Sequence, residues 1–105
     1  MSDRARTAEE YAGLVDQAIF DLEELRSSSE YDFDEVDSGM PFLDALLAEV
    51  RALRASMADG SYLFGRQDLP FMRIVKRCDE KTLPFIKLFY QINKTHRQGL
   101  DIQQE

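Results

Sequence analysis

Two stretches of the sequence, LPFMRIVKRCDEK (residues 69–81) and LPFIKLFYQINKT (residues 83–95), open with the same tripeptide 14 residues apart. A third version, Met40-Pro41-Phe42, lies upstream, and these three places hold every proline of the chain. Proline has the φ angle of a first helical turn, and the N–H that it lacks would be unpaired there. We therefore interpret the three prolines as marks of helix starts.

The repeated tripeptide predicts two helices, at residues 69–79 and 83–98. Asp68 and Thr82 precede them and are good N-cap residues. When the two copies are aligned, apolar residues fall at matching positions and form one stripe on each helix. These residues are Phe71, Ile74, Val75 and Cys78 in the first copy and Phe85, Leu88, Phe89 and Ile92 in the second. Two copies are too few for a solenoid.

Two further helices are predicted upstream, at residues 8–27 and 41–58. Thr7 followed by Glu10 makes a capping box, in which each side chain accepts the other residue's backbone N–H. Apolar residues at helical spacing follow as far as the serines at 27–29, where this helix is expected to end. The helix that begins at Pro41 is expected to end at Gly60, which can adopt a left-handed conformation.

These elements predict an all-α chain, a four-helix up-down bundle-like single domain. Residues 1–6 and 100–105 are expected to be disordered tails, and residues 30–39 an acidic loop. A calcium loop starting at Asp32 fails in register, because Val36 stands at the fifth ligand position and Asp37 at the glycine position. Tyr62 and Phe64 are expected to close the end of the core from a packed turn.

Charge is unevenly distributed along the 105 residues, whose net charge is −7. Residues 1–60 carry 15 acidic and 5 basic side chains, whereas residues 61–105 carry 5 acidic and 8 basic ones. Overall acidity disfavours nonspecific nucleic-acid binding, since phosphates repel the molecule. No apolar run approaches a membrane span or a secretory signal, and a single cysteine excludes an internal disulfide. We expect a cytoplasmic protein without membrane insertion.

Catalytic and metal-binding patterns are not found in the sequence. His96 is the only histidine, and a zinc site needs further cysteine or histidine ligands. We interpret His96 as a residue favoured by the dipole at a helix C-terminus, and Cys78 as a small buried hydrophobe. Glycines occur singly, without a phosphate-binding or nucleophile-elbow pattern. We therefore expect no enzyme, no cofactor, no metal and no small-molecule ligand.

An interaction surface is the remaining functional candidate. Phe20 lies about 180° from the apolar stripe of its helix, among acidic residues, and basic or aromatic residues mark the polar faces of the last two helices: Arg73, Lys76, Arg77, Lys87, Tyr90, Lys94 and Arg97. We expect a protein–protein interaction or regulatory adaptor module. One form of it is a weak homodimer in which Phe20 meets its partner near Arg73 and Lys76. The alternative is a helix-turn-helix regulator that binds nucleic acid through the last two helices.

Residues 50–79, VRALRASMADGSYLFGRQDLPFMRIVKRCD, resemble the cytoplasmic helical module of type II secretion F proteins. The shared features are a helix ending in a D-G-S turn, a short connector and an apolar-Pro-apolar helix start. F proteins also carry transmembrane helices, and this chain shows none. The resemblance implies a secretion-associated adaptor without catalysis.

Overall fold

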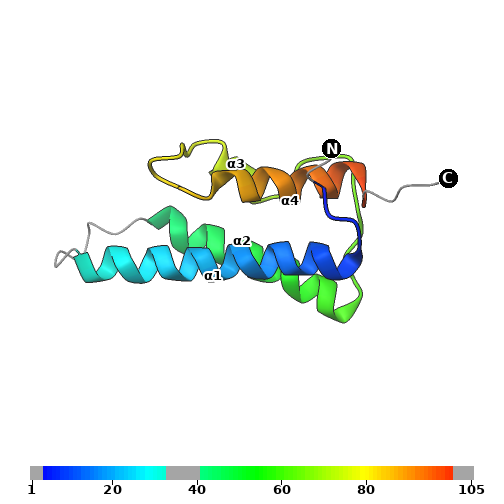
Figure 1. Cartoon of the computed structure of the whole chain (residues 1–105), viewed down its shortest axis with the longest axis horizontal. Helices are drawn as coiled ribbons and strands as arrows, with labels where there is room; N and C mark the ends of the chain where they lie inside the picture. Colours follow the sequence, from blue (N-terminus) through cyan, green and yellow to red (C-terminus); the bar gives the residue numbers. More distant parts are fainter. Residues whose placement is uncertain (1–3, 33–40, 101–105) are drawn as a thin grey trace.

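The computed structural model describes residues 4–32 and 41–100, which form four helices and, within these ranges, no strand. The helices are α1 (Ala8–Asp32), α2 (Pro41–Asp59), α3 (Met72–Val75) and α4 (Ile86–Gln98). α1 and α2 run antiparallel along the molecule, and α4 lies beside them (Figure 1). α1 packs against both α2 and α4, while the short α3 contacts α4 and α2.

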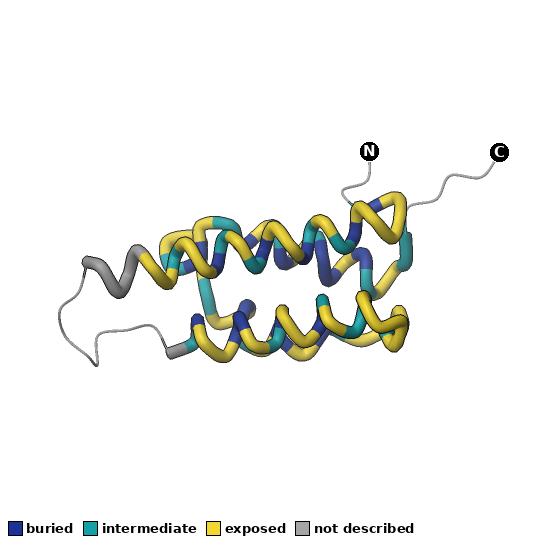
Figure 2. The backbone as a smooth tube through the Cα atoms, turned by 90° about the horizontal axis from the view of Figure 1, so that it is seen from below, coloured by how far each residue is buried: buried dark blue, intermediate teal, exposed yellow. Residues whose placement is uncertain are grey.

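The molecule is two helix layers deep. Its principal extents are 56 × 30 × 21 Å, and the shortest corresponds to about two helix diameters. Buried residues face the space between the layers and exposed residues cover the outside (Figure 2). None of the described helices is both long and apolar enough to cross a membrane.

The all-α class is confirmed, but the regular up-down arrangement of four full helices is not. Residues 61–71, which run from the end of α2 towards α3, contain no helix, and α3 is a single turn of four residues. The prediction of a helix over residues 69–79 is therefore wrong in length. The other three predicted helices are present, but α1 ends at residue 32, α2 ends at residue 59 and α4 begins at residue 86.

Capping residues explain why the start of α1 and the end of α2 lie close to their predicted positions. Thr7 Oγ1 accepts the backbone N–H of Glu10 at 3.0 Å, as predicted, and Glu10 reaches back to the N–H of Arg6 instead of Thr7. Gly60 has a φ of 82° directly after α2. α1 runs five residues beyond its predicted end at residue 27, because serine lowers helix stability by only about 0.5 kcal/mol relative to alanine.

Both copies of Leu-Pro-Phe form the same turn ahead of the helix. Met72 N–H donates to the Leu69 carbonyl at 2.9 Å, and Ile86 N–H donates to the Leu83 carbonyl at 3.0 Å. Proline occupies the second position of each turn, where its fixed φ is favoured. Each helix therefore begins three residues later than predicted, and the repeat encodes a turn followed by a helix.

The predicted N-caps at these helices are wrong, because neither helix has a side-chain cap at its start. The Asp68 carboxylate instead accepts Lys76 Nζ at 2.6 Å and Asn93 Nδ2 at 2.9 Å. The backbone N–H of Thr82 donates to Asp79 Oδ1 at 3.0 Å, so Asp79 forms a turn that stops the first repeat.

The N-terminal segment is more ordered than predicted. Ala5 is buried, and its N–H donates to the hydroxyl of Thr95, which is also buried. The Arg4 guanidinium donates to the carbonyls of Gln98 and Gly99 at 3.0 and 3.1 Å, at the C-terminus of α4. Residues 4–6 thus do not belong to a disordered tail. Residues 1–3, most of the acidic loop at 30–39 and residues 101–105 lie outside the described residues.

Gly65 marks a close approach between the segment after α2 and α4. A Cβ built at Gly65 would lie 3.1 Å from His96 Nε2, whereas one built at Gly13 of α1 would meet nothing within 4 Å. Gly65→Ala is expected to lower the free energy of unfolding by about 1 kcal/mol through overpacking. Gly13→Ala, the matched control, is expected to raise it by about 0.5–1 kcal/mol. Chemical denaturation of both variants tests this, and a neutral Gly65→Ala would show that His96 is not held there.

Candidate functional site

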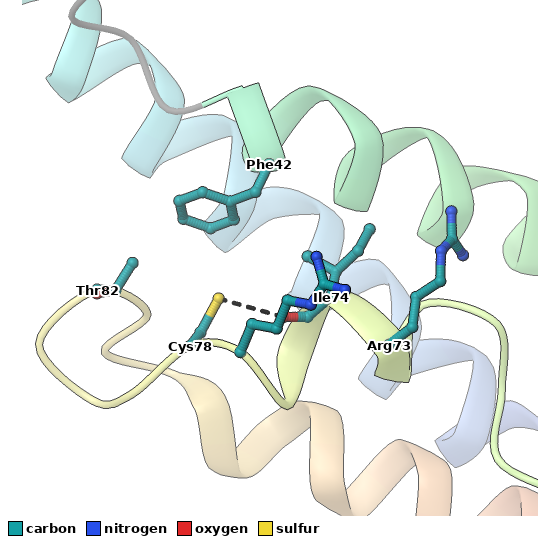
Figure 3. A pocket seen from close by; sticks show the side chains of 6 residues that line it. Phe42, Arg73, Ile74, Cys78 and Thr82 are labelled. Atoms are coloured by element: carbon teal, nitrogen blue, oxygen red, sulfur yellow. Dashed lines mark hydrogen bonds between the residues drawn. The ribbon is translucent and has the colours of Figure 1, made fainter.

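An apolar pocket opens between the first turn of α2 and the one-turn α3 (Figure 3). Its volume is about 250 Å³. Small-molecule sites usually range from about 300 to 1,000 Å³, so this pocket matches a single large side chain better than a cofactor. It is lined by Phe42, Arg73, Ile74, Arg77, Cys78 and Thr82.

The early end of α3 creates the pocket. Met72 and Val75 enter the core, which leaves Ile74 half-buried and turns Arg73 towards solvent. After α3 the chain enters the turn formed by Asp79, so Cys78 and Thr82 lie opposite Phe42. Had the helix continued to residue 79 as predicted, no such turn would face α2.

Two arginines, Arg73 and Arg77, line the pocket. Arg73 donates to the Pro70 carbonyl at 2.9 Å and to Glu49 Oε2 at 3.2 Å. Arg77 is exposed and has no ion pair within the described ranges. The nearest acid in sequence, Asp79, is occupied by the backbone N–H of Thr82, and this bond is the main reason that its pKa is lowered.

Cys78 is a protonated thiol in the pocket wall. Its Sγ donates to the Ile74 carbonyl at 3.5 Å (Figure 3). Burial, with a smaller contribution from the charge of Asp79, raises the pKa of the thiol. A raised pKa reduces the thiolate fraction that a nucleophile needs.

The predicted interaction residues of the last two helices fall into three groups. Arg73 and Arg77 line the pocket, whereas Lys76 and Arg97 both approach Asp68, at 2.6 and 3.4 Å. The remaining three lie on the exposed side of α4: Lys87, Tyr90 and Lys94. Because α3 has only one turn, the basic residues that follow it cannot extend one continuous helical face with those of α4.

Phe20 projects from α1 with 56% of its surface exposed. Two of the acids that flank it on the helix are already paired, since Asp16 contacts Arg54 at 2.8 Å and Glu23 contacts Arg51. These pairs join α1 to α2. Much of the negative charge that a Phe20-centred contact was expected to use is therefore balanced within the chain.

A second polar cluster joins three parts of the fold. Tyr62 and His96 Nδ1 share a hydrogen bond of 2.6 Å, and the hydroxyls of Tyr11 and Tyr62 are 2.8 Å apart. Tyr11 also donates to the Ile92 carbonyl at 3.2 Å. Phe64 stacks on the ring of Tyr11, so the packed turn predicted around Tyr62 and Phe64 is present, although Phe64 stays 46% exposed. This cluster connects α1, the segment after α2, and α4.

Burial lowers the pKa of His96, and the charge of Asp68 opposes this only in part. His96 lies in the last turn of α4, as predicted. Within residues 4–32 and 41–100, no three His, Cys, Asp or Glu side chains could hold a metal ion. We assign His96 to the structural network.

The lowered pKa of His96 predicts a loss of stability in mild acid. The unfolded chain takes up a proton at about pH 6.5, and the folded protein does so only at lower pH. Stability is therefore complete above about pH 6.5 and is lost as the pH falls through the folded-state pKa. His96→Asn is expected to flatten the dependence of the denaturation midpoint between about pH 6.5 and 5. An unchanged dependence in this variant would contradict the prediction, since the chain has no other histidine.

Comparison of the chain with protein-family models, curated proteins and solved structures found no match. The resemblance of residues 50–79 to secretion F proteins stays a prediction.

The sequence indicates both arginines of the pocket but not the pocket itself. The prediction places Ile74 and Cys78 in the core stripe of a longer helix. The available signal was Asp79 followed three residues later by Thr82, a spacing that suits a side-chain-closed turn.

Proposed function

We propose that this chain is a protein–protein interaction or adaptor module without catalytic activity, and that a side chain of its partner enters the pocket between α2 and α3. The observation that supports this is a solvent-accessible apolar pocket of side-chain size, walled by Phe42, Ile74 and Cys78. Such pockets accept the anchor residues that dominate many interfaces.

The chemistry of the pocket favours binding over catalysis. The thiol of Cys78 in its wall has a raised pKa. The charged groups at its mouth are arginines, which do not exchange protons near neutral pH. Both features suit recognition of a partner.

Peptide titration monitored by NMR tests the proposal. A short peptide with a central phenylalanine is expected to shift the amide signals of Phe42, Ile74 and Cys78 in the isotope-labelled protein. Ile74→Lys should abolish these shifts and keep the fold, because a half-buried lysine can extend its ammonium into solvent.

Phe20→Ala is the matched control for a different apolar contact on the surface. It should leave the shifts at the pocket unchanged. Loss of peptide binding in Phe20→Ala, with normal binding in Ile74→Lys, would show that the peptide binds the outer face of α1 and not the pocket.

Self-association through Phe20 remains a less supported form of this proposal. The basic residues expected to receive Phe20 have partners in their own chain, since Arg73 contacts Glu49 and Lys76 contacts Asp68. A dimer would have to exchange these pairs for equivalent ones, with little net gain for exposed charges.

The nucleic-acid alternative is also less supported. α3 is one turn, whereas a helix-turn-helix unit needs two helices, and Arg97 of α4 contacts Asp68. We expect no mobility shift of duplex DNA at low salt. A secretion-associated adaptor would be a special case of the main proposal.

A further inference from the structure

We infer that the pocket between α2 and α3 recognises an acidic segment of a protein partner, in which an apolar anchor residue is flanked by carboxylates that pair with Arg77 and Arg73. This inference rests on the proposed function and specifies its ligand. The apolar wall selects the anchor, and the two arginines select the charge beside it.

Arg77 supplies the main charge selection. The residue lines the pocket and is exposed, and its guanidinium has no hydrogen bond or ion pair within the described part of the chain. Guanidinium groups bind carboxylates through two parallel hydrogen bonds, which fix orientation as well as charge. A carboxylate next to the anchor residue could therefore pair with Arg77 without breaking an existing interaction of that side chain.

Arg73 is oriented by a hydrogen bond to the backbone, and its ion pair with Glu49 can be replaced by a pair with a partner's carboxylate. The Pro70 carbonyl accepts one of its N–H groups at 2.9 Å, which orients the side chain. Its pair with Glu49 is longer, at 3.2 Å, and 62% of the Arg73 side chain is exposed. Exposed pairs contribute little to stability, so replacing Glu49 with a carboxylate of the partner costs little.

The local charge balance disfavours a basic partner. Asp79 is close to Arg77 in sequence, but the two form no ion pair within the described residues, and the Asp79 carboxylate accepts the backbone N–H of Thr82. A lysine or arginine beside the anchor would meet the unpaired guanidinium of Arg77, and repulsion between like charges provides specificity against such segments. The pocket should therefore rank partners as acidic, then neutral, then basic.

Fluorescence anisotropy with three labelled peptides tests this ranking. Each peptide carries a central phenylalanine, flanked on both sides by aspartate and glutamate, by asparagine and glutamine, or by lysine. The acidic peptide is expected to bind at least about tenfold more tightly than the neutral one at low salt. Raising the salt from about 0.05 to about 0.5 M should shrink this difference, because exposed ion pairs are screened.

Matched charge reversals locate the selectivity. Arg77→Glu should weaken binding of the acidic peptide about tenfold or more, with little effect on the neutral peptide. Lys87→Glu makes the same charge change on α4, away from the pocket lining, and should leave the preference for the acidic peptide intact. An equal effect of both variants would mean general attraction to a basic surface and would overturn the inference.

The failure of the inference and of the proposed function can be told apart. Equal binding of the acidic and neutral peptides, with NMR shifts at Phe42 and Ile74, would overturn acidic recognition and leave an apolar docking pocket. Shifts confined to residues outside the pocket lining, or no binding of any peptide, would overturn both.

Discussion

Phe89→Ala is expected to lower the free energy of unfolding by about 3 to 5 kcal/mol. Phe89 is fully buried, and its ring meets Phe71 edge-on with centroids 5.6 Å apart. It also contacts Phe85, at 5.7 Å. These rings join the two Leu-Pro-Phe copies, so the variant would leave a cavity where the repeats pack together.

Tyr90→Ala is the control for this prediction, because Tyr90 is the next residue of α4 and 45% of its surface is exposed. We expect this change to alter stability by no more than about 0.5 kcal/mol. Urea denaturation of both variants compares a buried and an exposed aromatic ring on the same helix. Similar losses for the two would mean that α4 does not present Phe89 to the core.

Asn93→Ala is expected to cost about 2 kcal/mol, although it removes only a small side chain. Asn93 Oδ1 accepts the backbone N–H of Leu69 at 2.8 Å, and its Nδ2 donates to Asp68 at 2.9 Å. Leu69 is buried, so the variant would leave its N–H without a partner. This residue of α4 holds the start of the first repeat.

Asn93→Asp separates the two bonds. The introduced carboxyl group can still accept the backbone N–H of Leu69. It cannot replace the Nδ2 donor, so it faces the carboxylate of Asp68 without that hydrogen bond. Its proximity to Asp68 favours the protonated form, so the deficit relative to the wild type should shrink as the pH falls. A neutral Asn93→Ala, measured by denaturation at pH 7, would contradict the role of this residue.

Local chemistry made much of α1 and α2 predictable from sequence. Thr7 caps α1, and Gly60 adopts the left-handed conformation after α2, because both effects depend on residues adjacent in the chain. The end of α1 was not predictable from serines alone, since their cost per residue is small.

The second half of the fold depends on contacts between distant residues. Asp68 has the sequence position of an N-cap. In the fold its carboxylate instead contacts Lys76, Asn93 and Arg97, which all lie further along the chain. The order at Arg4 and Ala5 likewise comes from α4, more than 85 residues away. A single-sequence pattern contains no information about such partners.

The candidate site was predictable in charge and not in shape. Arg73 and Arg77 could be named from composition, because they lie in the basic half of the chain. The apolar wall required knowledge that α3 stops at Val75, which places Ile74 and Cys78 at a surface. The position at which α3 ends therefore decides whether Ile74 and Cys78 lie in the core or line a pocket.

Alkylation of Cys78 tests the central claim most directly, because it is the only cysteine of the chain and lines the pocket. The rate of modification by N-ethylmaleimide, followed by mass spectrometry, is measured with and without the acidic peptide. A bound anchor residue would cover the thiol, so we predict that a saturating concentration of peptide slows modification several-fold, and that Arg77→Glu reduces this protection at the same peptide concentration. An unchanged rate in the wild-type protein, at peptide concentrations that saturate the anisotropy signal, would show that the peptide binds elsewhere and would contradict the account.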